Sequence, residues 1–113
     1  MQKYWYDAQI IDVYDGDTVT IDIDLGFDAH VLNQKFRLYG VDAPELRGEN
    51  KEAGKTAKQA LKERVLGKEV LIHTIKDKKD KYGRWLCEIW LDGENINQWL
   101  IDSGHARIYT ESV

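Results

Sequence analysis

The stretch from residue 18 to residue 25 alternates between polar and apolar side chains with a period of two. Val19, Ile21, Ile23 and Leu25 are apolar, and a threonine or an aspartate precedes each of them. Successive side chains of a β-strand point to opposite faces of the sheet, so this pattern predicts a strand with one buried face. The partners of this strand have to be sought along the rest of the chain.

Four further segments have the apolar and aromatic content of strands. They are residues 5–14, 31–41, 70–75 and 85–91. Asp-Gly pairs at residues 15–16 and 92–93 are turn signals that separate a strand from the next element of the chain. The sequence therefore predicts five strands, three of them before the helical segment and two after it.

One long helix is predicted over residues 50–66, where alanine, leucine and valine recur at helical spacing and lysine and glutamate occupy the other face. Gly67 stands where a C-terminal glycine cap belongs. A short helix with Ile96, Trp99 and Leu100 on its apolar side is expected to end at Gly104. Residues 107–109 add one more extended piece.

This order of elements predicts an α+β fold, mainly β: a five-stranded OB-like barrel with one long and one short helix packed outside. The 113 residues suffice for one compact domain, and 42% of them are apolar, which can fill one core. No repeat, linker or low-complexity tract divides the chain. We therefore expect a single domain over residues 1–113.

Charge, cysteine content and hydropathy narrow the function classes. The formal net charge of −4 argues mildly against nucleic-acid binding, because such domains usually carry a basic surplus. The single cysteine, Cys87, has no internal partner and is expected to be an inert core thiol. No stretch is long enough to span a membrane, and the first residues lack a signal-peptide core. The chain would be cytoplasmic if it is full length and secreted if a leader was trimmed.

The first cluster of candidate functional residues is Asp15-Gly16-Asp17-Thr18, before the alternating strand. Asp17 has the same parity as Val19 and Ile21, so a regular strand would direct it toward the apolar side. An ionised carboxylate in that position needs a cation or an arginine as partner. The alternative is a turn carboxylate that caps backbone amides, and the Asp-Gly-Asp pattern alone favours that interpretation.

The second cluster covers residues 37–45, Arg-Leu-Tyr-Gly-Val-Asp-Ala-Pro-Glu. Asp42 and Glu45 can converge at the end of a strand, because Pro44 stiffens the backbone between them. Together with Asp17 they would form an all-oxygen site, which suits a hard cation such as calcium or magnesium. The equally weighted alternative is that both carboxylates only cap the loop before the helix.

The third cluster, residues 76–84, contains five basic and two acidic side chains. Its lysines are typical of a solvated hairpin connection. The functional interpretation is an electrostatic landing site for phosphates. Arg84, at the start of a strand, would be held more firmly than the lysines that precede it.

The three clusters, in this order and at this spacing, resemble the staphylococcal nuclease family. The resemblance continues into residues 96–100, Ile-Asn-Gln-Trp-Leu, and 104–106, Gly-His-Ala. It implies a single-calcium phosphodiesterase that hydrolyses both DNA and RNA. We therefore expect DNA and RNA as substrates. We also expect a monomer without membrane association, since no stretch of the chain is long enough to span a membrane.

The resemblance assigns a role to each site residue by its motif position. Three residues would bind calcium: Asp17 and Asp42 through their carboxylates and Ala43 through its backbone carbonyl. Asp15 would orient these ligands. Glu45 would act on the attacking water, as general base or as its positioner. Arg37 and Arg84 would grip the scissile phosphate, where a planar guanidinium can bond two oxygens at once. The nucleotide would contact Lys81, Tyr82 and Tyr109.

Two positions depart from the family pattern. The family often has threonine at the position of Ala43, although a main-chain ligand survives the change. The family has a pair of tyrosines after the position of Ala106. Here the one tyrosine in that part of the sequence is Tyr109, which is not clearly in register with the pair. The main alternative function is a catalytically inactive, nuclease-like module that binds nucleic acid or protein. A plain single-strand-binding barrel is a second alternative. The retained acids and both arginines favour the enzyme over either one.

The remaining polar and aromatic residues are expected to be structural. The three histidines fall outside every motif and have no ligand spacing. The four tryptophans could stack on bases, but their strand and helix positions favour packing. Trp5 is the tryptophan for which that choice stays most open.

Overall fold

The computed structural model describes residues 3–110 and contains five long strands. These are β1 (Trp5–Asp15), β2 (Thr18–Gly26), β3 (Ala29–Leu38), β5 (Glu69–Lys79) and β6 (Trp85–Leu91). Three two-residue strands accompany them: β4 (Val41–Asp42), β7 (Glu94–Asn95) and β8 (Arg107–Ile108). The helices are a 3₁₀ turn at Gly48–Asn50, α1 (Lys51–Val65) and α2 (Ile96–Asp102).

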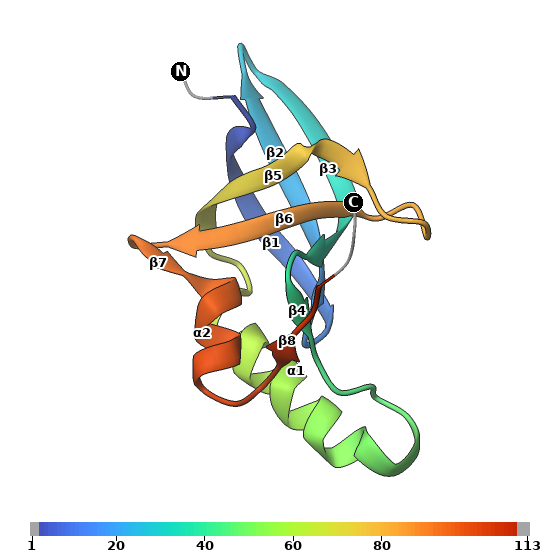
Figure 1. The fold of residues 1–113 in the computed structure, drawn as a ribbon. Coiled ribbons are helices and arrows are strands. Elements are labelled where there is room, and N and C mark those ends of the chain that lie inside the picture. The colour runs from blue at the N-terminus through green and yellow to red at the C-terminus, as the bar shows by residue number, and fades with distance from the viewer. Residues whose placement is uncertain (1–2, 111–113) are drawn as a thin grey trace.

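The five long strands close into a barrel (Figure 1). The hydrogen-bonded order is β3-β2-β1-β5-β6, and all of these pairs are antiparallel. The barrel closes where β3 pairs in parallel with β6, with Phe36 opposite Trp85 and Leu38 opposite Cys87. The predicted mainly β fold, a five-stranded barrel with one long and one short helix, is confirmed.

The alternation that predicted β2 decides which side chains fill the barrel. Val19, Ile21 and Ile23 are buried, and they pack with the inward residues of the other strands into one core. Cys87 is fully buried in the same core, and burial raises the pKa of its thiol. The prediction of a core cysteine is therefore confirmed.

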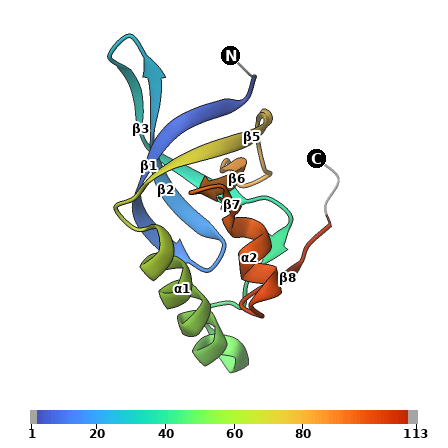
Figure 2. The ribbon, with the colours of Figure 1, turned by 90° about the vertical axis from the view of Figure 1, so that its left-hand side faces the viewer.

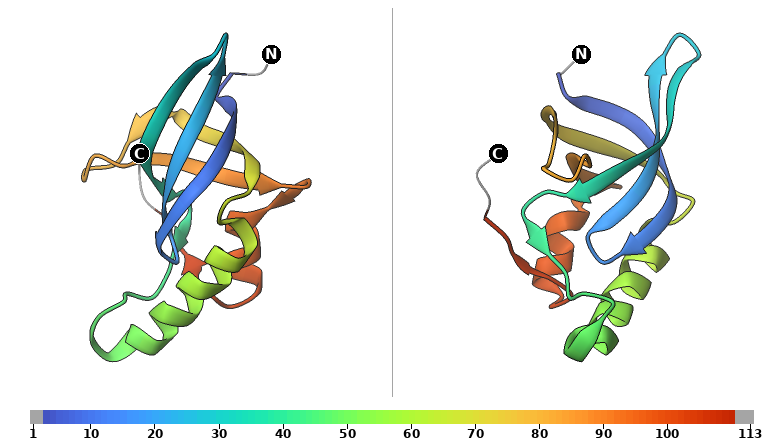
Figure 3. Two further views of the ribbon diagram at one scale, coloured as in Figure 1. Left: turned by 180° about the vertical axis from the view of Figure 1, so that it is seen from behind. Right: turned by 90° about the vertical axis from the view of Figure 1, so that its right-hand side faces the viewer.

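Both helices lie at the same end of the barrel, opposite the tip of the β2–β3 hairpin (Figure 2). Helix α1 buries Ala57, Leu61 and Val65 against the core, and Gly67 follows it with a positive φ of 74°, as a C-terminal cap requires. The turn between β1 and β2 lies at this helical end (Figure 3). None of the helices within residues 3–110 is long and apolar enough to cross a membrane.

Helix α2 is attached to the barrel through one buried amide. The Nδ2 group of Asn97 donates to the backbone carbonyls of Tyr39 and Cys87 at 2.9 and 3.0 Å. Its Oδ1 accepts a hydrogen bond from the backbone N–H of Ile89 at 3.0 Å. Asn97 therefore links α2, strand β6 and the turn after β3.

Two strand boundaries differ by three or more residues from those predicted. Strand β3 ends at Leu38 rather than continuing to residue 41, because Gly40 has a φ of 80°, and Val41–Asp42 pairs with β8 instead. Strand β5 continues past residue 75 to Lys79 through a bulge in which Lys76 and Asp77 both have a φ of 52°. Asp77 accepts hydrogen bonds from the hydroxyls of Thr74 and Tyr6, which fixes this bulge.

Candidate functional site

The candidate site forms where the β1–β2 turn, the end of β3 and the start of β6 meet. Thr18 pairs with Arg37 across β2 and β3, and Arg37 pairs with Leu86 across β3 and β6. The backbone N–H of Leu38 donates to the carbonyl of Asp17 at 2.8 Å. The closed barrel thereby brings together Asp17, Arg37 and the segment that begins with Arg84, although these lie far apart in the sequence.

Asp17 is the buried carboxylate of the site, with 7% of its surface exposed. Its Oδ2 accepts a hydrogen bond from the backbone N–H of Ala43 at 2.9 Å and lies 3.3 Å from Nη1 of Arg37. Its Oδ1 accepts from the hydroxyl of Thr18 at 3.1 Å. The inward direction predicted from strand parity is found, and in this structure the required partner is an arginine.

Burial, followed by the neighbouring Asp15, raises the pKa of Asp17 to about 6, although the Ala43 amide and Arg37 act in the opposite direction. Asp15 is also the residue that caps the turn: its Oδ1 accepts from the backbone N–H of Asp17 at 3.0 Å. The turn-carboxylate interpretation offered for this motif therefore applies to Asp15. Its role in orienting metal ligands stays a prediction.

Arg37 is buried to a similar extent, with 9% of its surface exposed. Besides its contact with Asp17, its Nη2 donates to the carbonyl of Val41 at 3.0 Å and lies 3.9 Å from a carboxylate oxygen of Asp42. The ring of Tyr109 packs against the guanidinium, with 4.9 Å from Cζ to the ring centroid. Arg37 thus lies between Asp17 and Asp42 and beside Tyr109.

Arg84 is fixed by Asp80. Its Nε and Nη2 contact Oδ2 of Asp80 at 2.8 and 2.7 Å, and its backbone N–H donates to Oδ1 of the same carboxylate at 3.0 Å. Burial opposes ionisation of Asp80, but the hydrogen bonds from Arg84 and from the Tyr82 amide lower the pKa of Asp80 overall. The Nη1 group of Arg84 also donates to the hydroxyl of Thr18 at 3.3 Å.

Tyr82 and Lys81 occupy the tip of the β5–β6 connection, next to Arg84. Tyr82 is 72% exposed, and the guanidinium of Arg84 and the ammonium of Lys81 each lie 5.3 Å from the centroid of its ring. Each of the two candidate catalytic arginines therefore has a partly exposed tyrosine beside it. Nucleotide binding by Lys81, Tyr82 and Tyr109 stays a prediction.

The other predicted site residues lie in or just after β4: Asp42 is its second residue, and Ala43 and Glu45 follow it. Asp42 lies 3.4 Å from Nη2 of Arg107, which faces it across the β4–β8 pair. Glu45 is exposed, and within residues 3–110 no hydrogen bond or ion pair joins its side chain to the other candidate residues. In the same range no three His, Cys, Asp or Glu side chains lie close enough to hold a metal ion. The calcium ligands and the role of Glu45 stay predictions.

Two glycines that sequence reasoning did not connect with the site allow its loops to pack on α1. A Cβ atom on Gly16 would lie 2.7 Å from Cβ of Ala43 and 2.8 Å from that of Ala57. A Cβ atom on Gly54 would lie 2.2 Å from the carbonyl oxygen of Glu45. The one available signal was a glycine in the middle of an otherwise regular helix pattern. Thr18 and Asp80 stand in the first and third clusters but received no role, and Arg107 was missed because its contact with Asp42 depends on the β4–β8 register.

The fold and site define the class of the protein: a small closed five-stranded barrel with a buried carboxylate and two anchored arginines at one end. The comparison with known families agrees with this class: residues 35–113 match the family described as staphylococcal nuclease homologue. This match covers more than half of the chain, and the chain belongs to the staphylococcal nuclease family.

Individual relatives extend the similarity toward the N-terminus. The thermonuclease of Staphylococcus hyicus is 35% identical over 102 residues, which cover 88% of this chain and 57% of that protein. The thermonuclease of Staphylococcus intermedius is 40% identical over 98 residues, or 84% of this chain and 55% of that protein. A protein of Escherichia coli O157:H7 described as an uncharacterized endonuclease is 30% identical over 105 residues, or 92% of this chain and 61% of that protein. The chain thus spans little more than half the length of the two thermonucleases.

Proposed function

We propose that this protein is a calcium-dependent phosphodiesterase that hydrolyses DNA and RNA. Membership of the staphylococcal nuclease family supports nuclease chemistry. The observation that carries the proposal is the attachment of two guanidiniums to one carboxylate. Arg37 contacts Asp17 directly, and Arg84 reaches it through the hydroxyl of Thr18.

This arrangement suits the charge that develops during phosphodiester hydrolysis. Negative charge accumulates on the phosphoryl oxygens in the transition state, and donors that are already oriented stabilise it without reorganising. Arg37 is held by Asp17 and by the Val41 carbonyl, and Arg84 is held by Asp80. Both guanidiniums would therefore meet the phosphate in a fixed orientation.

The residues present fit a calcium ion. Asp17, Asp42 and the Ala43 carbonyl would hold it, and all three offer the oxygen donors that hard cations prefer. The buried Asp17 carboxylate, whose pKa is raised to about 6, is the kind of group that a cation would keep ionised. When bound, calcium supplies positive charge and polarises a phosphoryl oxygen.

The remaining residues would bind and position the reactants. Glu45 would orient the attacking water or accept its proton, and its exposure leaves the carboxylate accessible from solvent. Tyr109 and Tyr82, beside the two arginines, would contact the nucleotide on either side of the scissile phosphate, and Lys81 would add a charge at the exposed tip.

Incubation with labelled single-stranded DNA and RNA oligonucleotides tests this proposal. With calcium present, we expect shortened products on a denaturing gel from both substrates. A catalytically inactive nucleic-acid-binding module would instead retard the oligonucleotides on a native gel and leave them intact. Intact substrate after prolonged incubation with calcium and folded protein would refute the proposal and support that alternative.

A further inference from the structure

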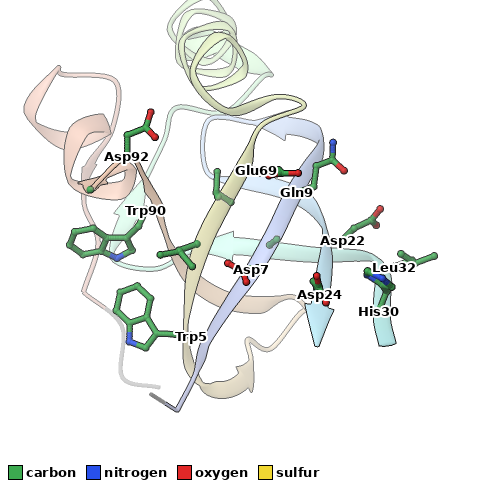
Figure 4. Close-up of a pocket in the computed structure, with 14 residues that line it drawn as sticks. Trp5, Asp7, Gln9, Asp22, Asp24, His30, Leu32, Glu69, Trp90 and Asp92 are labelled. Carbon is green, nitrogen blue, oxygen red and sulfur yellow. The ribbon is translucent and has the colours of Figure 1, made fainter. Parts of the chain in front are cut away.

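A groove with a volume of about 1050 Å³ crosses the outer surface of the barrel, and none of its lining residues belongs to the candidate site (Figure 4). Its floor is formed by the outward side chains of β1, β2 and β5, with β3 and β6 at its two sides. We call this surface the acidic groove, because five carboxylates line it: Asp7, Asp22, Asp24, Glu69 and Asp92.

Strand register gives the order of side chains across the acidic groove. His30 faces Asp24, Asp24 faces Asp7, Asp7 faces Leu71, and Leu71 faces Trp90. Like charges directly opposite each other on neighbouring strands destabilise a sheet. Asp7 and Asp24 nevertheless form such a pair, and within residues 3–110 neither carboxylate takes part in an ion pair.

The acidic groove accounts for the net charge that argued against a nuclease. Its lining includes five carboxylates and His30 but neither lysine nor arginine. Without these five negative charges, the net charge of −4 would become +1. Strand β2 runs from Thr18 at the candidate site to Asp24 in the groove, a separation of about 20 Å at the rise of a strand. The acidic surplus is therefore concentrated away from the two arginines.

Two tryptophans and a leucine make the other end of the acidic groove mainly aromatic and apolar, with Asp92 beside them. Trp5 stacks on His73 with 4.5 Å between ring centroids and lies 5.9 Å from Trp90. Leu71, next to Trp90, is 44% exposed. Figure 4 shows Trp5 and Trp90 together on one side, with Asp22 and Asp24 on the opposite side. Asp92 lies on the tryptophan side and Leu32 on the side of Asp22 and Asp24, so one end of the groove is mainly acidic and the other mainly aromatic.

We propose that the acidic groove binds an extended peptide segment that carries lysine or arginine at one end and a large apolar residue at the other. The carboxylates would attract the basic end, and Leu71 with the two tryptophans would cover the apolar end. Five strands at about 4.8 Å spacing give a path of about 19 Å, which is the length of about six extended residues. The partner is therefore a basic and apolar segment of another protein.

Two other occupants fit less well. A metal ion needs several ligands that converge, but the five carboxylates of the groove are spread over three strands and one turn. Nucleic acid would be repelled, because its phosphates would face carboxylates without an intervening cation. The proposal is independent of the nuclease function, so it is tested without nucleic acid and with a chelator present.

The probe is a hexapeptide with three arginines, one glycine and two leucines, with both ends blocked, added to the ¹⁵N-labelled full chain. We expect saturable chemical-shift changes at the amides of Asp7, Asp24 and Leu71, and none at Arg37 or Arg84. Spermine and a peptide with glutamates in place of the arginines should bind at least tenfold more weakly. Equal binding of either control, or changes confined to the arginines, would overturn the proposal.

A matched pair of double variants separates the groove from general charge attraction. Asp7→Asn with Asp24→Asn should weaken peptide binding about tenfold, equivalent to about 1.4 kcal/mol. Asp12→Asn with Glu63→Gln removes the same charge from two residues outside the groove lining and should change affinity less than twofold. The groove variant should also melt at a higher temperature, since it removes the Asp7–Asp24 repulsion. Equal weakening by both pairs would contradict the groove as the binding site.

Discussion

The guanidinium of Arg84 donates a hydrogen bond to the hydroxyl of Thr18 at 3.3 Å. That hydroxyl donates in turn to Asp17, whose other carboxylate oxygen faces Arg37. Arg37 in β3 and Arg84 just before β6 are therefore both connected to one buried carboxylate at the barrel end, and Arg84 is held by Asp80 as well. This relationship makes the geometry of both guanidiniums depend on the β1–β2 turn.

Thr18→Val should reduce turnover and leave the barrel folded. Valine keeps the shape of the buried side chain but removes the link between Arg84 and Asp17. Arg84 remains attached to Asp80, so the loss should be about tenfold in kcat, the effect of about 1.4 kcal/mol. Single-turnover kinetics beside thermal melting provide the measurement. Unchanged turnover in the folded variant would remove Thr18 from the account.

Arg37→Lys and Arg84→Lys should each reduce turnover by about 100-fold to 1,000-fold, or roughly 3 to 4 kcal/mol, the typical effect of a fixed electrostatic donor. Lysine retains the charge but lacks the planar fork. Arg37→Lys should also lower stability, because Arg37 is buried against Asp17. If the arginine were purely structural, the turnover of its lysine variant would fall only in proportion to the unfolded fraction. Circular dichroism melting measures that fraction.

Without calcium, Asp17 should make the protein less stable as the pH rises. The pKa of Asp17 is raised from 3.8 in the unfolded chain to about 6 in the folded state, so the folded state binds more protons between these values. Its contribution is therefore present at low pH and is lost as the pH rises through about 6. The free energy of unfolding of the wild-type protein, measured relative to that of Asp17→Asn, should fall by about 2 kcal/mol between about pH 4.5 and 7.5. Urea unfolding of both proteins in chelator measures the difference, and an increase with pH would contradict the assignment.

Gly54→Ala should destabilise the protein although it improves the intrinsic helix propensity. At an exposed position inside a helix, alanine is more favourable than glycine by about 1 kcal/mol. Here the new Cβ would lie 2.2 Å from the Glu45 carbonyl, so the loop that carries Glu45 has to move. Turnover should fall together with stability. The control, Thr56→Ala, changes an exposed residue two positions further along α1. It should reduce neither stability nor turnover.

The strands of the barrel and the burial of Asp17 could be predicted from the sequence because both depend on local patterns. The roles of the site residues came from the resemblance to the family and stay predictions. Strand alternation placed Asp17 on the inner side before any pairing was known. The bulge at Lys76 and Asp77 could not be predicted, since two residues other than glycine adopt positive φ there through contacts with Tyr6 and Thr74. Such contacts depend on the tertiary fold rather than on local sequence.

The same distinction between local sequence and tertiary contacts applies to the residues that surround the site. Arg37 and Arg84 were identified from their motifs, but Arg107 was not, because only the β4–β8 register places it opposite Asp42. The acidic groove was also invisible in the sequence. Its carboxylates come from three strands and one turn, so the net charge alone does not show that they gather on one face.

Nicking of supercoiled plasmid DNA under defined metal conditions tests the central claim most directly. The wild-type protein and Asp17→Asn, purified in parallel, would be assayed with calcium, with magnesium and with excess chelator. We expect wild-type nicking with calcium, little with magnesium because that ion demands tight octahedral coordination, and none with chelator. The Asp17→Asn protein should be inactive throughout, which controls for a contaminating nuclease. Wild-type activity that persists in excess chelator, or that Asp17→Asn shares, would contradict the account.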